Sequence, residues 1–189
     1  PEFARSADPR FLAMSFRHDR PVPLSLIERA KEICQEQNLD LIFVTQVWKD
    51  APQHQRLAEQ FEARHLDWQD RNHRTQLPEV MGTYSRSKYV ISNRLHALIL
   101  GWNVGALPLG YSAVDDAKIW SHMGELGLES LVVYDEEIPG LATHLSTHSE
   151  QLNRVSQRAH DQAVKAVSAI EEELRHLVDG TDSLNRLIV

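Results

Sequence analysis

Cysteine is nearly absent from the chain: among its 189 residues only Cys34 is a cysteine. A single cysteine excludes an internal disulfide, which is typical of proteins from a reducing compartment. Cys34 follows Ile27 and Ala30 at helical spacing, which favours a small packed side chain over a reactive thiol. We therefore expect a cytoplasmic protein without disulfides.

Basic residues are scarce in relation to acidic ones. Lys and Arg number 20 against 27 Asp and Glu, so the formal net charge is −7. No block of Lys or Arg offsets this balance, and nucleic acid is therefore not expected as a partner. The length is that of one ordinary globular domain, large enough to bury a hydrophobic core.

Long hydrophobic runs are also missing. The longest apolar stretch, 97–110, contains Asn103 and three glycines and is too short to cross a bilayer. No basic segment followed by an apolar one opens the chain, so no signal sequence is expected. Residues 1–3, Pro-Glu-Phe, are interpreted as a cloning remnant because the first residue is not Met.

Several motifs of well-known chemistry are absent. The sequence has no glycine-rich phosphate loop, no G-x-S-x-G motif and no Cys–His pair with a suitable base. His144 and His148 lie four residues apart, but no third ligand follows at the spacing of a zinc site. They are interpreted as histidines on a solvated helix face, and no metal is expected. The kinds of chemistry that these absences leave open are anion binding and acid–base catalysis.

Short apolar runs alternate with amphipathic segments through residues 4–140, which we interpret as one domain. Strands are predicted near 10–16, 39–47, 66–68, 89–92, 106–109 and 131–134. Helices are predicted near 24–37, 52–65, 78–87, 95–104 and 116–126. This alternation predicts an α/β fold with a Rossmann-like, doubly wound parallel sheet.

Residues 141–179 are predicted to form a long helical segment. Its apolar residues recur at steps of three or four along one stripe: Leu152, Val155, Ala159, Ala163, Ala166, Ile170, Leu174 and Leu177. We expect this stripe to pack on the domain itself or on a missing N-terminal half. A coiled-coil dimer is the alternative, although its alanines would make a weak zipper.

The segment 89–111 is predicted to form a strand–helix–strand unit at the centre of the fold. Its first four residues are β-branched or aromatic, as in a strand buried on both faces. Apolar residues then recur at helical spacing from Leu95 to Trp102, and Gly105 is expected to end the helix. Asn93 is the predicted N-cap.

Arg94 and His96 fall in the first turn of this predicted helix. The partial positive charge of a helix N-terminus disfavours cations, so two basic residues there suggest that an anion binds at this end. The alternative is that Arg94 pairs with a structural carboxylate and that His96 is an ordinary solvated or packed histidine. On an ideal helix the two side chains are about 200° apart, so a shared ligand would have to lie beyond the helix end.

Other polar residues follow the ends of other predicted strands, namely Arg17, Gln46, Asp50 and Tyr111. The carboxyl ends of parallel strands share one edge of the sheet, where ligands bind, so these residues are expected to converge with Asn93, Arg94 and His96. Arg17 fits a second anion contact and a surface position equally well. Asp50 is expected mainly to cap the helix that starts near Ala51.

Residues 92–101 read S-N-R-L-H-A-L-I-L-G, followed by Gly105, a Pro-containing strand and Tyr111. This pattern resembles the signature of the polysaccharide pyruvyl transferase family. Members of that family have an Arg-Leu-His-Ala-like helix start after a buried strand, and then a strand that ends in an aromatic residue. The similarity runs from about Phe11 to about Asp135.

The resemblance implies a transferase that moves a pyruvyl group from phosphoenolpyruvate onto two hydroxyls of a sugar, forming a ketal and releasing phosphate without a cofactor. It implies that His96 is the catalytic acid and that Arg94 and Arg17 clamp the carboxylate and phosphate. The remaining substrate-binding residues that it implies are Asn93, Gln46, Asp50, Tyr111 and Lys118. Lys118 is the least regular of these, because Ser-Ala-Val-Asp-Asp lengthens its spacing from Tyr111.

The resemblance also implies an architecture. Enzymes of this family are similar to B-type glycosyltransferases, with the active site in a cleft between two Rossmann-like halves. This chain would be the C-terminal half, so the expected partners are an N-terminal half, phosphoenolpyruvate and an acceptor sugar. The 189 residues are not expected to turn over by themselves.

Two other functions remain open. The chain could be the nucleotide-sugar-binding half of a B-type glycosyltransferase, in which Trp48 would contact the base and Asp50 the ribose. It could also be a non-catalytic α/β module that binds a partner through its long C-terminal helix. The latter predicts no affinity for anions at the carboxyl edge of the sheet.

Overall fold

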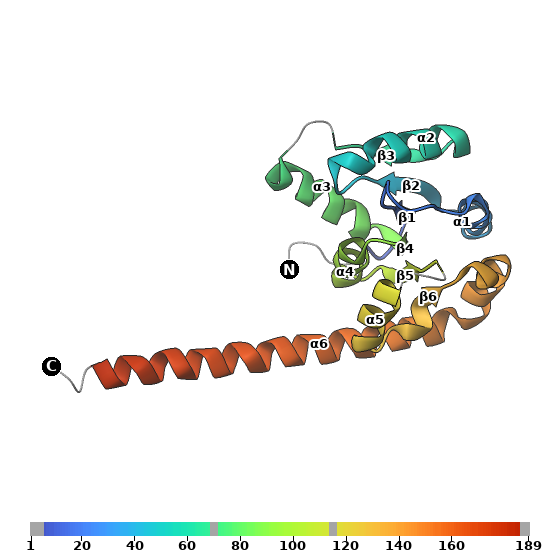
Figure 1. Ribbon diagram of the computed structural model, residues 1–189. Helices are drawn as coiled ribbons and strands as arrows, with labels where there is room; N and C mark the ends of the chain where they lie inside the picture. Colours follow the sequence, from blue (N-terminus) through green and yellow to red (C-terminus); the bar gives the residue numbers. More distant parts are fainter. Residues whose placement is uncertain (1–5, 69–71, 114–116, 186–189) are drawn as a thin grey trace.

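The computed structural model describes residues 6–68, 72–113 and 117–185, and the interpreted cloning remnant at 1–3 lies outside them (Figure 1). Six parallel strands form one sheet in the order β3-β2-β1-β4-β5-β6. Their bounds are β1 Phe11–Ser15, β2 Asp40–Val44, β3 Arg64–Leu66, β4 Ser87–Ser92, β5 Leu107–Tyr111 and β6 Val132–Val133. The predicted Rossmann-like, doubly wound parallel sheet is confirmed.

Helices connect successive strands. The α-helices are α1 Leu24–Gln37, α2 Ala51–Phe61, α3 His73–Ser85, α4 Leu95–Asn103, α5 Ala117–Glu125 and α6 Leu141–Asn185. Three short 3₁₀ segments are η1 Trp48–Asp50, η2 Glu129–Leu131 and η3 Asp135–Gly140. The prediction that the second strand runs to Val47 was wrong, because the chain leaves the sheet after Val44 and turns into η1.

Each face of the sheet carries its own hydrophobic core. Successive residues of a strand point to opposite faces, and β1 shows this in Leu12 and Met14 on one side and Phe11 and Ala13 on the other. The larger core includes residues of α1, α2 and the first part of α6, and it continues into α4 and α5 through residues such as Leu98 and Ile119. The smaller core packs under α3 and one side of α4, through residues such as Tyr84. A sheet covered on both faces explains the nearly continuous apolar strands.

The third helix begins earlier than predicted. We expected Pro78 at its start, but α3 begins at His73 and Pro78 lies inside it. The cap is Asn72, whose side-chain oxygen accepts the backbone N–H of Thr75 at 3.1 Å. An N-cap side chain of this kind satisfies one of the free N–H groups of the first turn, and this signal outweighs the preference of proline for the first position.

The long helix α6 has a packed and an exposed part. Leu145, Leu152 and Ala159 are buried in the larger core, so this part of the helix packs on the domain. The helix then continues past the body of the molecule (Figure 1). On that projecting part Val167, Ile170 and other apolar side chains are more than half exposed. Within the described residues, no helix combines the length and apolarity required to cross a membrane.

The helix α4 packs so closely on β4 that Gly101 has no room for a side chain. A Cβ atom at this position would lie 2.5 Å from Cγ2 of Val90. We expect Gly101→Ala to lower the free energy of unfolding by roughly 1–3 kcal/mol, because overpacking displaces neighbours in a dense core. Urea denaturation measures this difference.

Gly82 supplies the matched control, because it is also helical but a Cβ atom added there would have no neighbour within 4 Å. Gly82→Ala should stabilise α3 by up to about 1 kcal/mol through better helix propensity. The close approach of α4 and β4 would be contradicted if Gly101→Ala were no more costly than Gly82→Ala.

Candidate functional site

The candidate site lies at the carboxyl edge of the sheet, where β1 and β4 are neighbours. In this strand order the connections leave these two strands toward opposite faces of the sheet, which opens a crevice for ligands between their ends. The segment after β1 carries Arg17 and His18, the one after β2 carries Gln46 and Asp50, and the one after β4 carries the sequence Asn93–His96.

The carboxylate of Asp50 ties these three segments together. Its side chain is fully buried, and Nε of Arg94 donates to its Oδ2 at 2.6 Å. Its Oδ1 accepts the backbone N–H of His18 at 3.0 Å and lies 2.9 Å from Nδ1 of the same residue. The prediction that Asp50 caps the helix after it was wrong, because its side chain makes no cap hydrogen bond to α2.

The ionised state of Asp50 is favoured by its partners. Burial by itself would raise the pKa of this carboxyl, because it removes the charge from water. The hydrogen bonds from Arg94 and His18 and the guanidinium charge outweigh burial, and the pKa of Asp50 lies below its usual value. The ionised carboxylate of Asp50 is thus the favoured partner of the guanidinium and the imidazole.

The start of α4 differs from the prediction by one residue. Arg94, rather than Asn93, occupies the N-cap position, in an extended conformation and without a side-chain cap. Asn93 instead accepts the backbone N–H of Arg17 on its Oδ1 at 2.9 Å. Ser92 Oγ accepts the N–H of Arg94 at 2.8 Å. The residues after β4 are thus fixed against the end of β1.

Arg94 and His96 line one cavity of about 290 Å³ together with Gln46. Because Arg94 precedes the helix, the 200° separation of an ideal helix does not apply to this pair. The other walls come from α3, from Trp68 before it and from Leu100 of α4. Trp68 and His73 meet edge to face with ring centres 4.9 Å apart. The cavity therefore combines a cationic rim with apolar and aromatic walls.

Gln46 and Arg17 are near this edge but have protein partners. Nε2 of Gln46 donates to the hydroxyl of Tyr84 at 2.9 Å, which fixes the amide in the wall of the cavity. Nε and Nη2 of Arg17 donate to the two carboxylate oxygens of Asp19 at 2.8 and 2.6 Å. The predicted clamp by Arg17 would require a ligand to compete with Asp19.

Tyr111 and Lys118 are not among the described residues that line the cavity. Tyr111 is buried and its hydroxyl donates to Oδ1 of Asp135 at 2.8 Å. Burial and this neighbouring carboxylate raise the pKa of Tyr111 above its usual value. Lys118 lies exposed on α5. The geometry therefore brings Arg94, His96, Gln46 and Asp50 together, and leaves these two outside.

Sequence reasoning did not assign a role to His18. It also did not assign one to a buried set of hydrogen-bonded side chains, His54, Thr45 and His65, which we call the relay. The backbone N–H of Phe16 donates to Nε2 of His54 at 2.9 Å, so the ring proton of neutral His54 is on Nδ1, which lies 3.0 Å from the hydroxyl of Thr45. That hydroxyl is also 2.9 Å from Nε2 of His65. Burial lowers the pKa of His54 to about 4, and these contacts join the ends of β1, β2 and β3.

One feature of the sequence could have identified His54 as buried, and another could have identified His18 as a candidate site residue. His54 precedes Leu57, Ala58 and Phe61 at helical spacing, which places it on the buried face of α2. His18 directly follows the first strand in the run Arg-His-Asp-Arg. Position after a strand was the criterion that selected Arg17, and it applies equally to His18.

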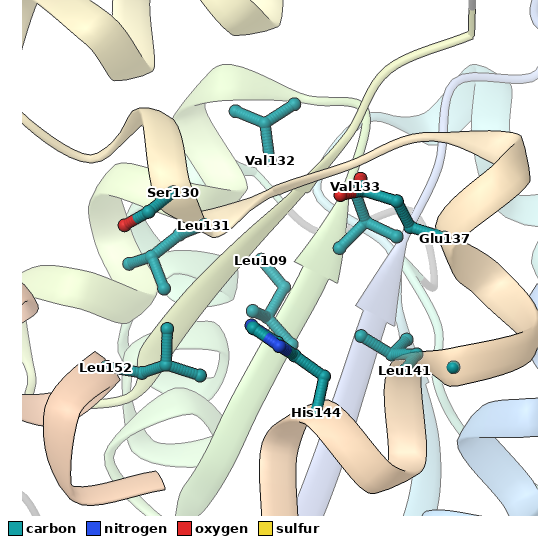
Figure 2. Close-up of a pocket in the computed structure, with 10 residues that line it drawn as sticks. Leu109, Ser130, Leu131, Val132, Val133, Glu137, Leu141, His144 and Leu152 are labelled. Carbon is teal, nitrogen blue, oxygen red and sulfur yellow. The ribbon is translucent and has the colours of Figure 1, made fainter. Parts of the chain in front are cut away.

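A second cavity, of about 250 Å³, lies between β5, β6, η3 and α6 (Figure 2). Its lining is mostly aliphatic, as with Leu109 and Val133, and the ring of His144 extends toward it. None of the predicted site residues lines it. The rings of His144 and His148 are 4.8 Å apart, and the described residues include no group of three or more side chains suited to hold a metal ion.

Neither a protein-family model nor a curated protein matches this chain. Solved structures do match it. The C-terminal CMP-Kdo binding domain of WaaA from Acinetobacter baumannii is 8% identical, with a TM-score of 0.54, over 82% of this chain and 89% of that one. Likeness at this identity shows the fold.

Two longer chains are similar in the same way. An O-GlcNAc transferase mutant from Thermobaculum terrenum matches with 12% identity and a TM-score of 0.55, over 84% of this chain and 32% of that one. A putative UDP-N-acetylglucosamine 2-epimerase from Listeria monocytogenes matches with 12% identity and a TM-score of 0.55, over 88% of this chain and 46% of that one. This chain thus spans less than half of either, and its Rossmann-like fold resembles one half of a B-type glycosyltransferase.

Proposed function

We propose that this chain is the C-terminal, phosphoenolpyruvate-binding half of a polysaccharide pyruvyl transferase. The observation that carries the proposal is the placement of Arg94 and His96, the ends of the Arg-Leu-His sequence, on one cavity at the carboxyl edge of the sheet. The resemblance of residues 92–101 to that family is the second support. The glycosyltransferase-like fold supports a transferase built from two such halves.

Phosphoenolpyruvate carries a carboxylate and a phosphate, and this edge offers donors for both. Among the described partners of Arg94, Asp50 engages Nε and Nη2 through one oxygen. A guanidinium has five N–H donors in a planar fork, so Asp50 leaves the hydrogens on Nη1 unused, and in this proposal they contact the ligand. The backbone N–H groups of Leu95 and His96 add further donors, since the first N–H groups of a helix have no acceptor in a preceding turn.

His96 is exposed at the start of α4 and lines the same cavity as Arg94. Pyruvyl transfer needs an acid that protonates the methylene carbon of phosphoenolpyruvate while a sugar hydroxyl adds to its central carbon. An imidazole is suited to this role because its ordinary pKa lies near neutrality. In this proposal His96 is the acid, Arg94 holds the anion and Gln46 contributes to the wall of the cavity.

The acceptor sugar would enter from a second, N-terminal half facing this edge. In B-type architecture the reaction takes place between two halves, and this chain is comparable in extent to one of them. The exposed apolar part of α6 is consistent with a further protein surface in the complete enzyme. Activity is therefore expected from the full-length enzyme and not from this half by itself.

A second candidate is the nucleotide-sugar-binding half of a glycosyltransferase. The edge-to-face pair of Trp68 and His73 in the cavity wall could contact a base, which favours this function. The assignment of Asp50 to a ribose is disfavoured, because its carboxylate is fully buried and bonded to Arg94 and His18. Trp48 is 63% exposed on η1 and is not among the described residues lining the cavity.

Titration of the ¹⁵N-labelled protein with phosphoenolpyruvate tests the proposal. The backbone signals of Leu95, His96 and Ala97 should shift, because their N–H groups are in the first turn of α4. Arg94→Gln should weaken binding. Arg154→Gln is the matched control, since Arg154 is an exposed arginine paired with Glu150 on α6.

Parallel titrations with CMP and UDP separate the candidates. Tighter binding of a nucleotide than of phosphoenolpyruvate, with shifts at Trp68 and His73, would favour the second candidate. Absence of shifts with every ligand would favour a non-catalytic interaction module. In the full-length enzyme, phosphate release from phosphoenolpyruvate should depend on an acceptor sugar with two free hydroxyls.

A further inference from the structure

Pyruvyl transfer requires a base as well as an acid, and the following inference rests on the proposed function. The methylene carbon of phosphoenolpyruvate gains one proton, two sugar hydroxyls each lose one, and phosphate departs with one. His96 as the acid accounts for the first of these transfers. A second group near Arg94 must accept the proton of the first hydroxyl.

His18 is placed for this task by the same carboxylate that holds Arg94. Its Nδ1 lies 2.9 Å from Oδ1 of Asp50, while Nε of Arg94 lies 2.6 Å from Oδ2. The imidazole and the guanidinium are thus bound to the two oxygens of one buried carboxylate. His18 also follows β1, and Arg94 follows β4, so both lie at the point where ligands bind in this fold.

The hydrogen bonds determine which nitrogen of His18 carries a proton. An ionised carboxylate only accepts hydrogen bonds, so Nδ1 of His18 must be the donor to Asp50. In the neutral ring the lone pair is then on Nε2. Among the described residues Nε2 has no hydrogen-bond partner, and the side chain is 43% exposed. The lone pair of His18 is therefore open to a ligand at the carboxyl edge of the sheet, although His18 is not among the described residues that line the cavity of Arg94 and His96.

Two other histidines near this edge, His54 and His65, are not suited to the role. His54 is fully buried, and its Nε2 already accepts the backbone N–H of Phe16. Nε2 of His65 lies within hydrogen-bond distance of the hydroxyl of Thr45. Both belong to the relay that joins the strand ends. Of the histidines that follow β1 and β2, His18 alone within the described residues combines a carboxylate partner with exposure.

We propose that His18 is the general base of pyruvyl transfer, oriented by Asp50 as a positioning residue. Nε2 of His18 accepts the proton of the first sugar hydroxyl as its oxygen bonds to the central carbon, while His96 gives a proton to the methylene carbon. The carbon–oxygen bond to phosphate then breaks, phosphate leaves with the electron pair, and protonated His18 supplies its proton. The second hydroxyl closes the ketal and returns a proton to His96.

The tautomer of His18 is the first test, and it does not depend on activity. Long-range ¹H–¹⁵N NMR of the imidazole should show protonated Nδ1 and unprotonated Nε2 in the neutral ring. Asp50→Asn should reverse this, because an amide can donate to Nδ1. Protonated Nε2 in the neutral wild-type ring would overturn the proposal.

Kinetics of the full-length enzyme is the second test. His18→Gln should lower kcat by about two to four orders of magnitude, the range for loss of a general base, while the dissociation constant for phosphoenolpyruvate stays unchanged. Added imidazole should restore part of the rate. Asp50→Asn should also lower kcat, since a comparable change at a serine-protease Asp–His pair costs about 10⁴-fold through the wrong tautomer. His148→Gln, on an exposed face of α6, is the control.

The outcomes separate the two proposals. If the wild-type enzyme transfers pyruvyl groups and His18→Gln keeps the wild-type kcat, the base is not His18, whereas the proposed function stands. If the wild-type enzyme releases no phosphate from phosphoenolpyruvate with any acceptor sugar, the proposed function fails and the base role fails with it. Loss of kcat with rescue by imidazole supports both.

Discussion

Replacing His96 with alanine is expected to lower kcat of the full-length enzyme by about two to four orders of magnitude, as is usual for loss of a general acid. The side chain is exposed at the start of α4, in the wall of the cavity shared with Arg94, and contributes little to either core. The fold should therefore survive the change. Steady-state kinetics at varied phosphoenolpyruvate, together with urea denaturation, measures both effects.

His148→Ala is the matched control for this experiment. His148 is also an exposed helical histidine, and its Nδ1 lies near the backbone oxygen of His144. None of its described partners lines the cavity of Arg94 and His96. The substitution His148→Ala should leave both kcat and the free energy of unfolding unchanged. Near-normal turnover of His96→Ala together with reduced stability would show that His96 is structural and that the acid is another group.

Replacing Arg94 with alanine is expected to reduce both stability and binding. The change leaves the carboxylate of Asp50 fully buried without its guanidinium partner. Removal of one partner from a buried ion pair typically costs about 3–5 kcal/mol, because the other charge remains uncompensated. Affinity for phosphoenolpyruvate should also fall, since Arg94 would contact it in ground and transition states alike. Urea denaturation and ligand titration measure the two losses separately.

Arg17→Ala provides the comparison, because Arg17 forms an ion pair with Asp19 at an exposed position after β1. Exposed pairs contribute about 1 kcal/mol or less. The double variant Arg94→Ala/Asp50→Asn should recover part of the stability lost in Arg94→Ala, since it removes the unpaired charge. If Arg94→Ala cost no more than Arg17→Ala, Asp50 would not depend on Arg94 for its charged state.

The fold was accessible to sequence reasoning because its signals are local. Alternation of apolar runs and helical stripes predicted the parallel sheet, and the prediction was confirmed. The element bounds depended on side-chain hydrogen bonds that sequence pattern alone weighs poorly. Asn72 caps α3 in advance of Pro78, and Asn93 bonds to the end of β1 in place of capping α4.

The candidate site was predicted in part for a different reason. Residues after strand ends converge in any doubly wound sheet, so Arg94, His96, Gln46 and Asp50 could be selected without knowing their contacts. The pairing of Arg94 with Asp50 links positions 44 residues apart, and no pattern along the chain specifies it. Arg94 pairs with a structural carboxylate and also lines the cavity, and anion binding by this residue stays a prediction.

The two parts of α6 differ in what opposes their unwinding. As far as Ala159 the helix is held by side chains buried in the larger core. From Val164 to Leu174 its apolar side chains face solvent, and this part lacks the tertiary packing that supplies most of the stability of a helix in a protein. One continuous helix thus contains two segments with different free energies of opening. Burial of the projecting segment against another protein surface would raise its free energy of opening. The helicity of this segment is therefore expected to depend on such a contact.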